Sequence, residues 1–230
     1  MAATSTRLLL AELHSTRRLF LKRIDFPYTV GYGATECAPI ICYADYQEFV
    51  PGSCGKPVVH MEVKIDSPDP ENVPGEILAR GLNVMLGYFK NEEATAQTLD
   101  EDGWYHTGDL GLMDADGNVF IKGRSKNMLL GASGQNIYPE EIEDKLNSLA
   151  MVNECVVVQR GEKLVGLVHP DYDEAATMRL NDADLENIME QNRQELNASQ
   201  PPYCRLAAIE IVREEFEKTP KKSIKRYLYK

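Results

Sequence analysis

The stretch from Gly123 to Glu143 constrains the fold of this chain more than any other. It reads GRSKNMLLGASGQNIYPEEIE: basic residues in a glycine turn, a short apolar run, a glycine-containing loop and Pro-Glu-Glu. Proline at the first helical position loses no needed N–H group, and the two glutamates suit the positive end of the helix dipole. The stretch therefore predicts a strand, a glycine loop and a helix in succession.

Composition and charge limit the class of protein. The chain has 230 residues, of which 43% are hydrophobic and 27% charged, so it can bury the core of one large domain or two modest ones. Its formal net charge of −11 opposes a nucleic-acid partner, because binding phosphate backbones requires a basic face. We expect no nucleic-acid partner, and we expect small anionic ligands to be met by local positive sites.

The cysteines and the hydropathy pattern bear on location. The five cysteines are odd in number and widely spread, contain no C-x-x-C pair, and form no recognisable zinc set with the four histidines. They predict reduced thiols in a cytoplasmic protein. No apolar run approaches the roughly 18 to 20 residues that span a bilayer, so we expect at most peripheral membrane contact.

Two short motifs precede the opening stretch. Gly31-Tyr-Gly-Ala-Thr-Glu36 carries glycines that let the backbone approach a ligand or adopt a positive φ angle, although a tight turn alone is the alternative. Tyr105-His-Thr-Gly-Asp109 ends on an aspartate, which on its own is more often a turn or cap residue than a ligand contact.

Together, these three motifs resemble the adenylate-forming enzymes, which include acyl-CoA synthetases, peptide-synthetase adenylation domains and luciferases. The order and approximate spacing agree from roughly Asp25 to the end, and the form is nearest to that of the bacterial long-chain fatty acid:CoA ligases. The resemblance implies an α+β fold. Residues 1–125 would be the remnant of the large AMP-binding N-terminal domain with a small β-barrel subdomain, and residues 126–230 a compact, mobile C-terminal lid domain.

The resemblance also implies nucleotide contacts in the first motif. The aromatic ring of Tyr32 would pack on adenine beside Gly33, while the Thr35 hydroxyl and the Glu36 carboxylate would hold the phosphates and Mg²⁺. The residue types suit that role, because Mg²⁺ prefers hard oxygen ligands and usually takes only one or two protein carboxylates. Glu36 is therefore the candidate metal ligand.

Further roles follow from the later motifs. Asp109 would accept hydrogen bonds from both ribose hydroxyls of ATP, as suits an acceptor-only carboxylate, and Arg124 would be a second ribose or phosphate contact. Lys126 would be the hinge of the lid, with an ordinary loop lysine as the alternative. Gly131 and Gly134 would leave room for the pantetheine arm of coenzyme A.

The tail departs from the family pattern. Members usually carry Thr-Pro, two residues and then a catalytic lysine, but Ser223 stands in that position here. Lys222, slightly favoured, or Lys225 would supply the positive charge if the loop shifts by one or two residues. The alternative is a basic, solvated tail with no catalytic member.

Local patterns predict the remaining elements. The basic, leucine-rich residues 1–23 favour a helix cut from a larger domain over an organelle transit peptide. Periodicity and turn residues predict the following: strands at 25–30, 58–65, 75–81 and 207–212, helices at 92–99, 139–149 and 182–197, hairpins turning near 115–118 and 161–162, and a polar connector at 171–181.

The implied activity is an ATP-dependent long-chain fatty acid:CoA ligase that releases AMP and pyrophosphate, with fatty acid, ATP and CoA as substrates. No glycine-rich phosphate loop precedes Asp25, so we expect a C-terminal portion that requires the N-terminal half of the enzyme and cannot adenylate alone. Two alternatives stay open: a non-catalytic nucleotide-binding or interaction module, and an adenylating enzyme for aryl or amino acids.

Overall fold

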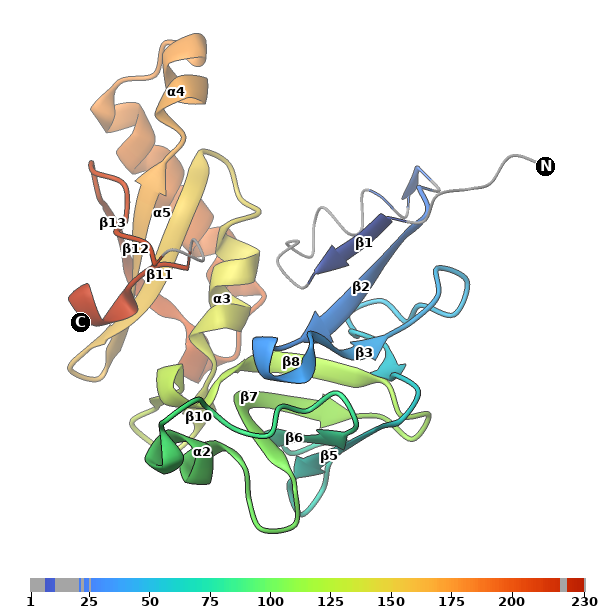
Figure 1. Cartoon of the computed structure of the whole chain (residues 1–230). Helices are drawn as coiled ribbons and strands as arrows, with labels where there is room; N and C mark the ends of the chain where they lie inside the picture. The colour runs from blue at the N-terminus through green and yellow to red at the C-terminus, as the bar shows by residue number, and fades with distance from the viewer. Residues whose placement is uncertain (1–6, 11–20, 22, 25, 220–222, 230) are drawn as a thin grey trace. The chain divides into compact units, whose positions relative to one another are not determined.

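The chain divides into two compact units, Met1–Lys126 and Asn127–Lys230, here called the first and second unit. The structure, a computed structural model, describes residues 7–10, 21, 23–24, 26–219 and 223–229 (Figure 1). Both units mix helices with mostly antiparallel sheets, which confirms the predicted α+β class. Within these ranges no helix is both long and apolar enough to cross a membrane.

The first unit begins with a four-stranded sheet. Its strands, in spatial order, are β1 (Arg7–Leu10), β2 (Tyr28–Gly33), β3 (Ile40–Tyr43) and β4 (Lys56–Pro57). β1 pairs with β2 in parallel, and the other pairs are antiparallel.

The strand β1 corrects part of the prediction for residues 1–23. Arg7–Leu10 form a strand rather than part of a helix, with Leu8 opposite Thr29 of β2. A short apolar run such as Leu8-Leu9-Leu10 fits a strand as well as a helix, and periodicity alone does not separate the two. Most of the remaining residues of this predicted segment lie outside the described ranges.

A second sheet of the first unit is an antiparallel meander in the order β5-β6-β7-β8. Its strands are β5 (Met61–Asp66), β6 (Gly75–Gly81), β7 (Tyr105–Met113) and β8 (Val119–Arg124). The helix α2 (Glu92–Thr98) lies between β6 and β7 in the chain, and the Asn91 side chain caps it by accepting from the Ala94 N–H group at 3.0 Å. These elements agree with the predicted strands, helix and hairpin.

The predicted small β-barrel is not closed. Among the described residues β5 and β8 are the two edges of an open sheet. The segment before β4 occupies part of the β8 edge instead: Cys54 N–H donates to the Val119 carbonyl at 2.8 Å, and Val119 N–H donates to the Gly55 carbonyl at 2.9 Å. Because the β8 edge is used in this way, closure against β5 is not required to satisfy it. Buried residues of both sheets, including Ile41 and Ile77, form one core.

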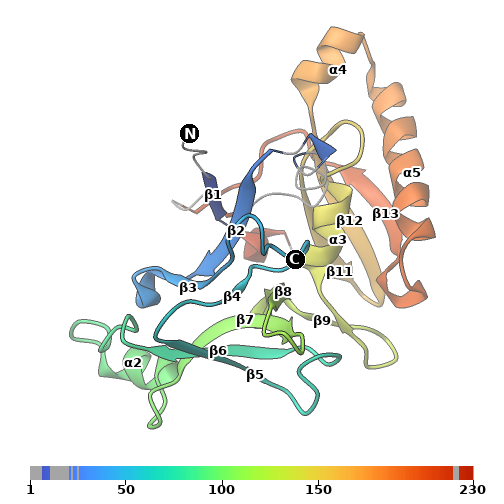
Figure 2. The ribbon, with the colours of Figure 1, turned by 90° about the vertical axis from the view of Figure 1, so that its right-hand side faces the viewer.

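The second unit is an α+β module around a three-stranded sheet, β11-β12-β13 (Figure 2). β11 and β12 form an antiparallel hairpin, and β12 and β13 pair in parallel across a helical connection. Its elements are β9 (Leu129–Leu130), β10 (Asn136–Ile137), α3 (Pro139–Leu146), β11 (Val152–Arg160), β12 (Lys163–Pro170), α4 (Tyr172–Met178), α5 (Asp182–Ala198) and β13 (Leu206–Ile211).

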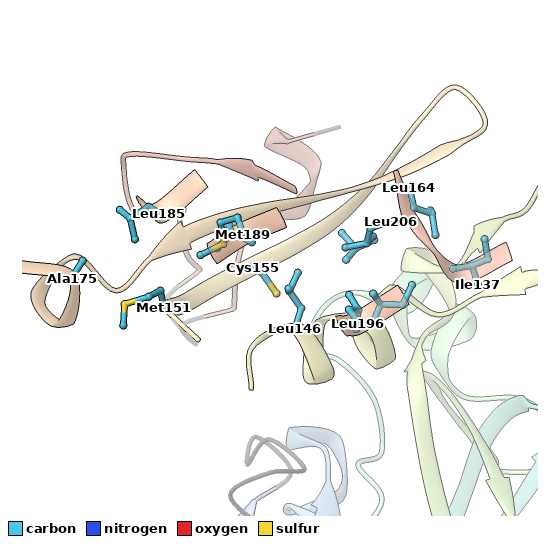
Figure 3. Packing of buried hydrophobic residues seen from close by; sticks show 13 residues of the cluster. Ile137, Leu146, Met151, Cys155, Leu164, Ala175, Leu185, Met189, Leu196 and Leu206 are labelled. Carbon is cyan, nitrogen blue, oxygen red and sulfur yellow. The ribbon is translucent and has the colours of Figure 1, made fainter. Parts of the chain in front are cut away.

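Both faces of this sheet are buried, because alternate residues of a strand point to opposite sides. On one face Cys155 and Val157 pack with residues of α3 and α5, such as Leu146 and Met189 (Figure 3). On the other face the intervening Val156 and Val158 join a smaller cluster, which Phe216 completes and which partly buried Ile224 and Tyr229 border. The C-terminal tail therefore belongs to the packing of the sheet.

The predicted polar connector at 171–181 is wrong, because the helix α4 occupies most of it. The Asp171 side chain accepts from the Glu174 N–H group at 2.9 Å and caps the helix, and Arg179 ends it in a left-handed conformation. A seven-residue helix carries too few apolar positions to show a clear period, so its cap was the only usable signal.

Candidate functional site

A bulge in β7 shapes the surroundings of Asp109. His106 pairs with Leu78 and Leu110 with Glu76, so three residues of β7 lie opposite the single residue Ile77 of β6. Gly108, in the middle of the bulge, has a φ angle of +69°, which a residue with a side chain adopts at a cost. The bulge changes the direction of the strand just before Asp109.

The Asp109 carboxylate lies between two donors. The Tyr32 hydroxyl donates to Oδ2 at 2.6 Å, and Arg124 Nε lies 2.8 Å from Oδ1. Arg124 also donates from Nη1 to the Thr107 carbonyl at 3.2 Å, which fixes its guanidinium against the bulge. Asp109 is 8% exposed, and a carboxylate offers about four acceptor positions, so it can accept further donors besides these two.

Tyr32 is the most buried residue of this group. It is 5% exposed and belongs to the core of the first unit. Burial, reinforced by the charge of Asp109 and the hydrogen bond to it, raises the pKa of Tyr32 far above its usual value, so the phenol stays protonated and donates to Asp109. The structure thus shows Tyr32 as an orienting partner of Asp109, and stacking of the ring on adenine stays a prediction.

Gly33 has a packing role in the structure. A Cβ atom built at this position would lie 2.0 Å from the Pro39 carbonyl oxygen, a distance that no side chain tolerates. The chain closes on itself here, because Ala34 N–H donates to the same oxygen at 2.8 Å. The predicted nucleotide contact at Gly33 stays a prediction beside this steric requirement.

Thr35 and Glu36 follow β2 directly, on the 3-10 turn η1 (Thr35–Cys37). Thr35 is exposed and Glu36 half-buried, and Glu36 Oε1 accepts from the Tyr88 hydroxyl at 2.8 Å. Tyr88 is a site residue that the sequence did not reveal, since its contact spans 52 positions along the chain.

The donor types on this turn fit Mg²⁺. The Thr35 hydroxyl and the Glu36 carboxylate are adjacent hard oxygen donors, as Mg²⁺ prefers. The described ranges contain no cluster of three or more His, Cys, Asp or Glu side chains suited to a metal. A protein-only cage is not needed where phosphate and water supply most of the ligands.

The remaining predicted site residues belong to the boundary and the second unit. Lys126 is exposed and ends the first unit. Gly131 and Gly134 form the turn between β9 and β10, where Gly134 N–H donates to the Gly131 carbonyl at 2.9 Å and Gly134 has a φ angle of +82°. Gly134 therefore has a conformational reason to be glycine.

The tail is fixed by side chains on either side of the position that Ser223 occupies. Lys225 Nζ lies 3.0 Å from Glu217 Oε2, and Lys218 Nζ lies 2.5 Å from Glu154 Oε1. Thr219 N–H donates to the Ser223 carbonyl at 2.8 Å. Lys222 lies outside the described residues.

Arg226, which the sequence did not single out, anchors this tail to α3. Its Nη2 group makes a very short contact with Glu143 Oε2, and Glu143 Oε1 accepts from the Val157 N–H group at 2.6 Å. Burial raises the pKa of Glu143 to about 7, against the lowering effects of Arg226 and the Val157 N–H group. A glutamate within the apolar stripe of α3, between Ile142 and Leu146, was the signal for a buried partner.

Comparisons with known proteins relate most of the chain to one family of enzymes. Residues 11–89 match the family described as AMP-binding enzyme, and residues 126–229 match the AMP-binding enzyme C-terminal domain. Among curated proteins, 4-coumarate--CoA ligase 5 of Oryza sativa subsp. japonica is 44% identical over 138 residues, which are 56% of this chain and 25% of that protein. The long-chain-fatty-acid--CoA ligase of Escherichia coli O157:H7 is 42% identical over 133 residues, which are 56% of this chain and 23% of that protein.

A solved structure extends the similarity. The anthranilate CoA ligase AuaEII, in complex with anthranoyl-AMP, is 27% identical with a TM-score of 0.80, over 97% of this chain and 43% of that one. The chain spans about a quarter of the length of the curated relatives it matches. With both family matches in order and the motifs in place, the chain belongs to the superfamily of AMP-binding, adenylate-forming enzymes.

Proposed function

We propose that the chain is the C-terminal portion of an ATP-dependent acid:CoA ligase. In the first step a carboxylate oxygen of the acid attacks the α-phosphorus of ATP, the bond to pyrophosphate breaks, and an acyl-adenylate forms. In the second step the CoA thiolate attacks the acyl carbonyl and AMP leaves, carrying the electron pair of the broken C–O bond. Because the chain spans about a quarter of its curated relatives, both steps would require the N-terminal half of the enzyme.

The observation that carries the proposal is the arrangement of Tyr32, Asp109 and Arg124. Asp109 is buried and held by donors on both oxygens, so its carboxylate is already oriented before a ligand arrives. A ribose diol donates two hydrogen bonds, and an acceptor-only carboxylate is its natural partner. In this assignment Arg124 orients Asp109 and adds positive charge beside the nucleotide.

Phosphate binding would fall to the turn after β2. The Thr35 hydroxyl would donate to a phosphate oxygen, and Glu36 would be the protein ligand of Mg²⁺, with the Tyr88 hydroxyl fixing one of its oxygens at 2.8 Å. When bound, Mg²⁺ supplies charge neutralisation on the phosphates.

The second unit would be the mobile lid, hinged at Lys126. It would bring the positive charge of Lys222 or Lys225 toward the phosphates in the first step and the turn of Gly131 and Gly134 toward the pantetheine arm in the second. Lys225 is paired with Glu217 on an exposed surface, a contact of small energy that a stronger anion would replace.

The acid is a separate question within this proposal. The overall resemblance of the motifs favours a long-chain fatty acid, and a long-chain-fatty-acid ligase is among the relatives. Ligases named for 4-coumarate and anthranilate, which are acids with an aromatic ring, are also similar to this chain, so an aryl acid is the second candidate. An amino acid is a third, with a carrier-protein thiol in place of CoA.

A nucleotide-binding module without catalysis is the alternative from another class. Ser223 in the family's lysine position favours it, because a hydroxyl supplies no positive charge to the transition state.

The test begins with AMP binding, measured by isothermal titration calorimetry. We expect Asp109→Asn to weaken AMP binding by about 10- to 100-fold, as expected for loss of a charged acceptor. Asp69→Asn, on an exposed loop of the same unit, should bind as the unaltered chain does. Equal AMP affinity in both variants would refute the ribose assignment.

Catalysis is tested by adding a separately expressed N-terminal half from a relative. We expect no ATP–pyrophosphate exchange by the chain alone and exchange in the mixture with the correct acid. AMP binding without exchange for any acid would favour the non-catalytic module.

A further inference from the structure

A second carboxylate, that of Glu76, lies on the bulge that presents Asp109. Its Oε1 accepts from the Gly108 N–H group at 2.9 Å, and its Oε2 lies 3.0 Å from His106 Nδ1. Because three residues of β7 lie opposite Ile77, the bulge interrupts the ladder of backbone hydrogen bonds between the two strands. The Glu76 side chain supplies the acceptor for the Gly108 N–H group.

The bulge is thus held by two side chains, one at each of two successive N–H groups. Gly108 N–H donates to Glu76, and Asp109 N–H donates to Thr107 Oγ1 at 3.0 Å. The Thr107 hydroxyl is itself fixed, since it donates to the Ile77 carbonyl at 2.7 Å. Gly108 directly precedes Asp109 and has a φ angle of +69°. A change in the backbone angles of Gly108 would therefore rotate the Asp109 carboxylate.

His106 keeps the Glu76 carboxylate in place. Nδ1 contacts Glu76, and Nε2 lies 3.6 Å from Asp100 Oδ2 on the turn before β7. The His106 and Glu76 side chains are 35% and 27% exposed, so protein atoms cover most of this contact. The contact between His106 Nδ1 and Glu76 Oε2 holds one oxygen of the carboxylate, and the other oxygen, Oε1, then faces the Gly108 N–H group.

We propose that Glu76 is a positioning residue for nucleotide binding, which acts through the Gly108 N–H group to hold Asp109 in its pair with Arg124. The inference rests on the proposed function, because the purpose of the alignment is the contact between Asp109 and the ribose. Glu76 itself touches no substrate in this assignment.

Nuclear magnetic resonance of the full chain tests the alignment without any nucleotide. In Glu76→Ala we expect amide exchange at Gly108 to become about tenfold faster or more, as expected for loss of a charge-assisted hydrogen bond, and the Arg124 Nε–H signal to shift and broaden. In Glu76→Gln the side-chain amide oxygen still accepts from the Gly108 N–H group, so protection should return.

The matched control is Glu62→Ala. Glu62 lies on the same sheet, and its carboxylate forms an exposed pair with Arg80, 2.7 Å apart. It should leave the Gly108 and Arg124 signals unchanged. If Glu76→Ala leaves both signals unchanged, or frees Gly108 without affecting Arg124, Glu76 does not position Asp109.

AMP titration then links the alignment to function. We expect the dissociation constant for AMP to rise by about tenfold or more in Glu76→Ala and to stay near the unaltered value in Glu76→Gln and Glu62→Ala. Failure of the unaltered chain to bind AMP would count against the proposed function, while the Gly108 and Arg124 signals would still decide the structural part. Unchanged AMP affinity in Glu76→Ala, beside binding by the unaltered chain, would overturn the inference.

Discussion

Replacement of Arg226 by leucine should destabilise the second unit in a pH-dependent way. Arg226 neutralises Glu143, which is almost fully buried between α3 and β11. Leucine keeps much of the apolar stem and removes the guanidinium. Among the described residues, the Val157 N–H group is then the one close donor left to the carboxylate, so its charged form becomes more costly.

The magnitude follows from the pKa of Glu143. Burial raises this pKa from 4.5 to about 7, so the folded protein holds the proton more tightly than the unfolded chain does. The stabilisation from this group is therefore complete below pH 4.5 and is lost as the pH rises to about 7, a change of about 3 kcal/mol. In Arg226→Leu the pKa rises further, so the loss continues by about 1.4 kcal/mol per pH unit above pH 7.

The assay is urea unfolding at pH 5, 7 and 9, followed by far-ultraviolet circular dichroism, because the long helix α5 lies in the second unit. We expect the penalty of Arg226→Leu to be about 2 to 3 kcal/mol larger at pH 9 than at pH 5. Fluorescence of the single tryptophan, Trp104, reports on the first unit, whose stability should not change.

Arg160→Leu is the control for this prediction. Arg160 Nη1 donates to both carboxylate oxygens of Glu210, Oε1 at 2.6 Å and Oε2 at 2.8 Å, and both side chains are about half exposed. Its loss should cost about 1 kcal/mol or less at every pH, because water screens the pair. A penalty for Arg226→Leu that is equal at pH 5 and pH 9 would show that Glu143 does not titrate as reasoned.

Three further predictions concern the other contacts. Gly33→Ala should lower the unfolding free energy of the first unit by about 2 kcal/mol or more, measured by tryptophan fluorescence in urea, because its Cβ would overlap the Pro39 carbonyl. Tyr32→Phe should weaken AMP binding by about fivefold to tenfold in calorimetry, since Asp109 loses the hydroxyl that fixes one of its oxygens. Asn181→Ala should lower the stability of the second unit by about 1 kcal/mol in circular dichroism, because it removes a capping box at α5.

Local signals in the sequence were sufficient for much of the fold. Pro139-Glu140-Glu141 predicted the start of α3, and the turn at Gly161 predicted the β11–β12 hairpin. The prediction was wrong for β1, because a run of three leucines fits either type of element. The barrel was predicted closed, but the Cys54–Gly55 segment bonds to the β8 edge, and no local pattern reveals such a contact.

In the candidate site too, some residues could be predicted from local motifs and others could not. Tyr32, Asp109 and Arg124 were named from their motifs, and the structure brings them together. Glu76 and Arg226 were missed, because each acts through a partner more than 25 positions away in the chain. Contacts of this length depend on tertiary packing, which a single sequence does not encode locally.

The tail that carries the candidate lysines also closes the second face of the sheet in its unit. Phe216 is buried there, with its ring centroid 5.0 Å from that of Tyr229, and the Tyr229 hydroxyl accepts from the Glu217 N–H group. Selection on this segment therefore acts on the packing of the second unit, whatever role its lysines have. A relative with other residues in place of these lysines would still need Phe216 and Tyr229 to cover this face of the sheet.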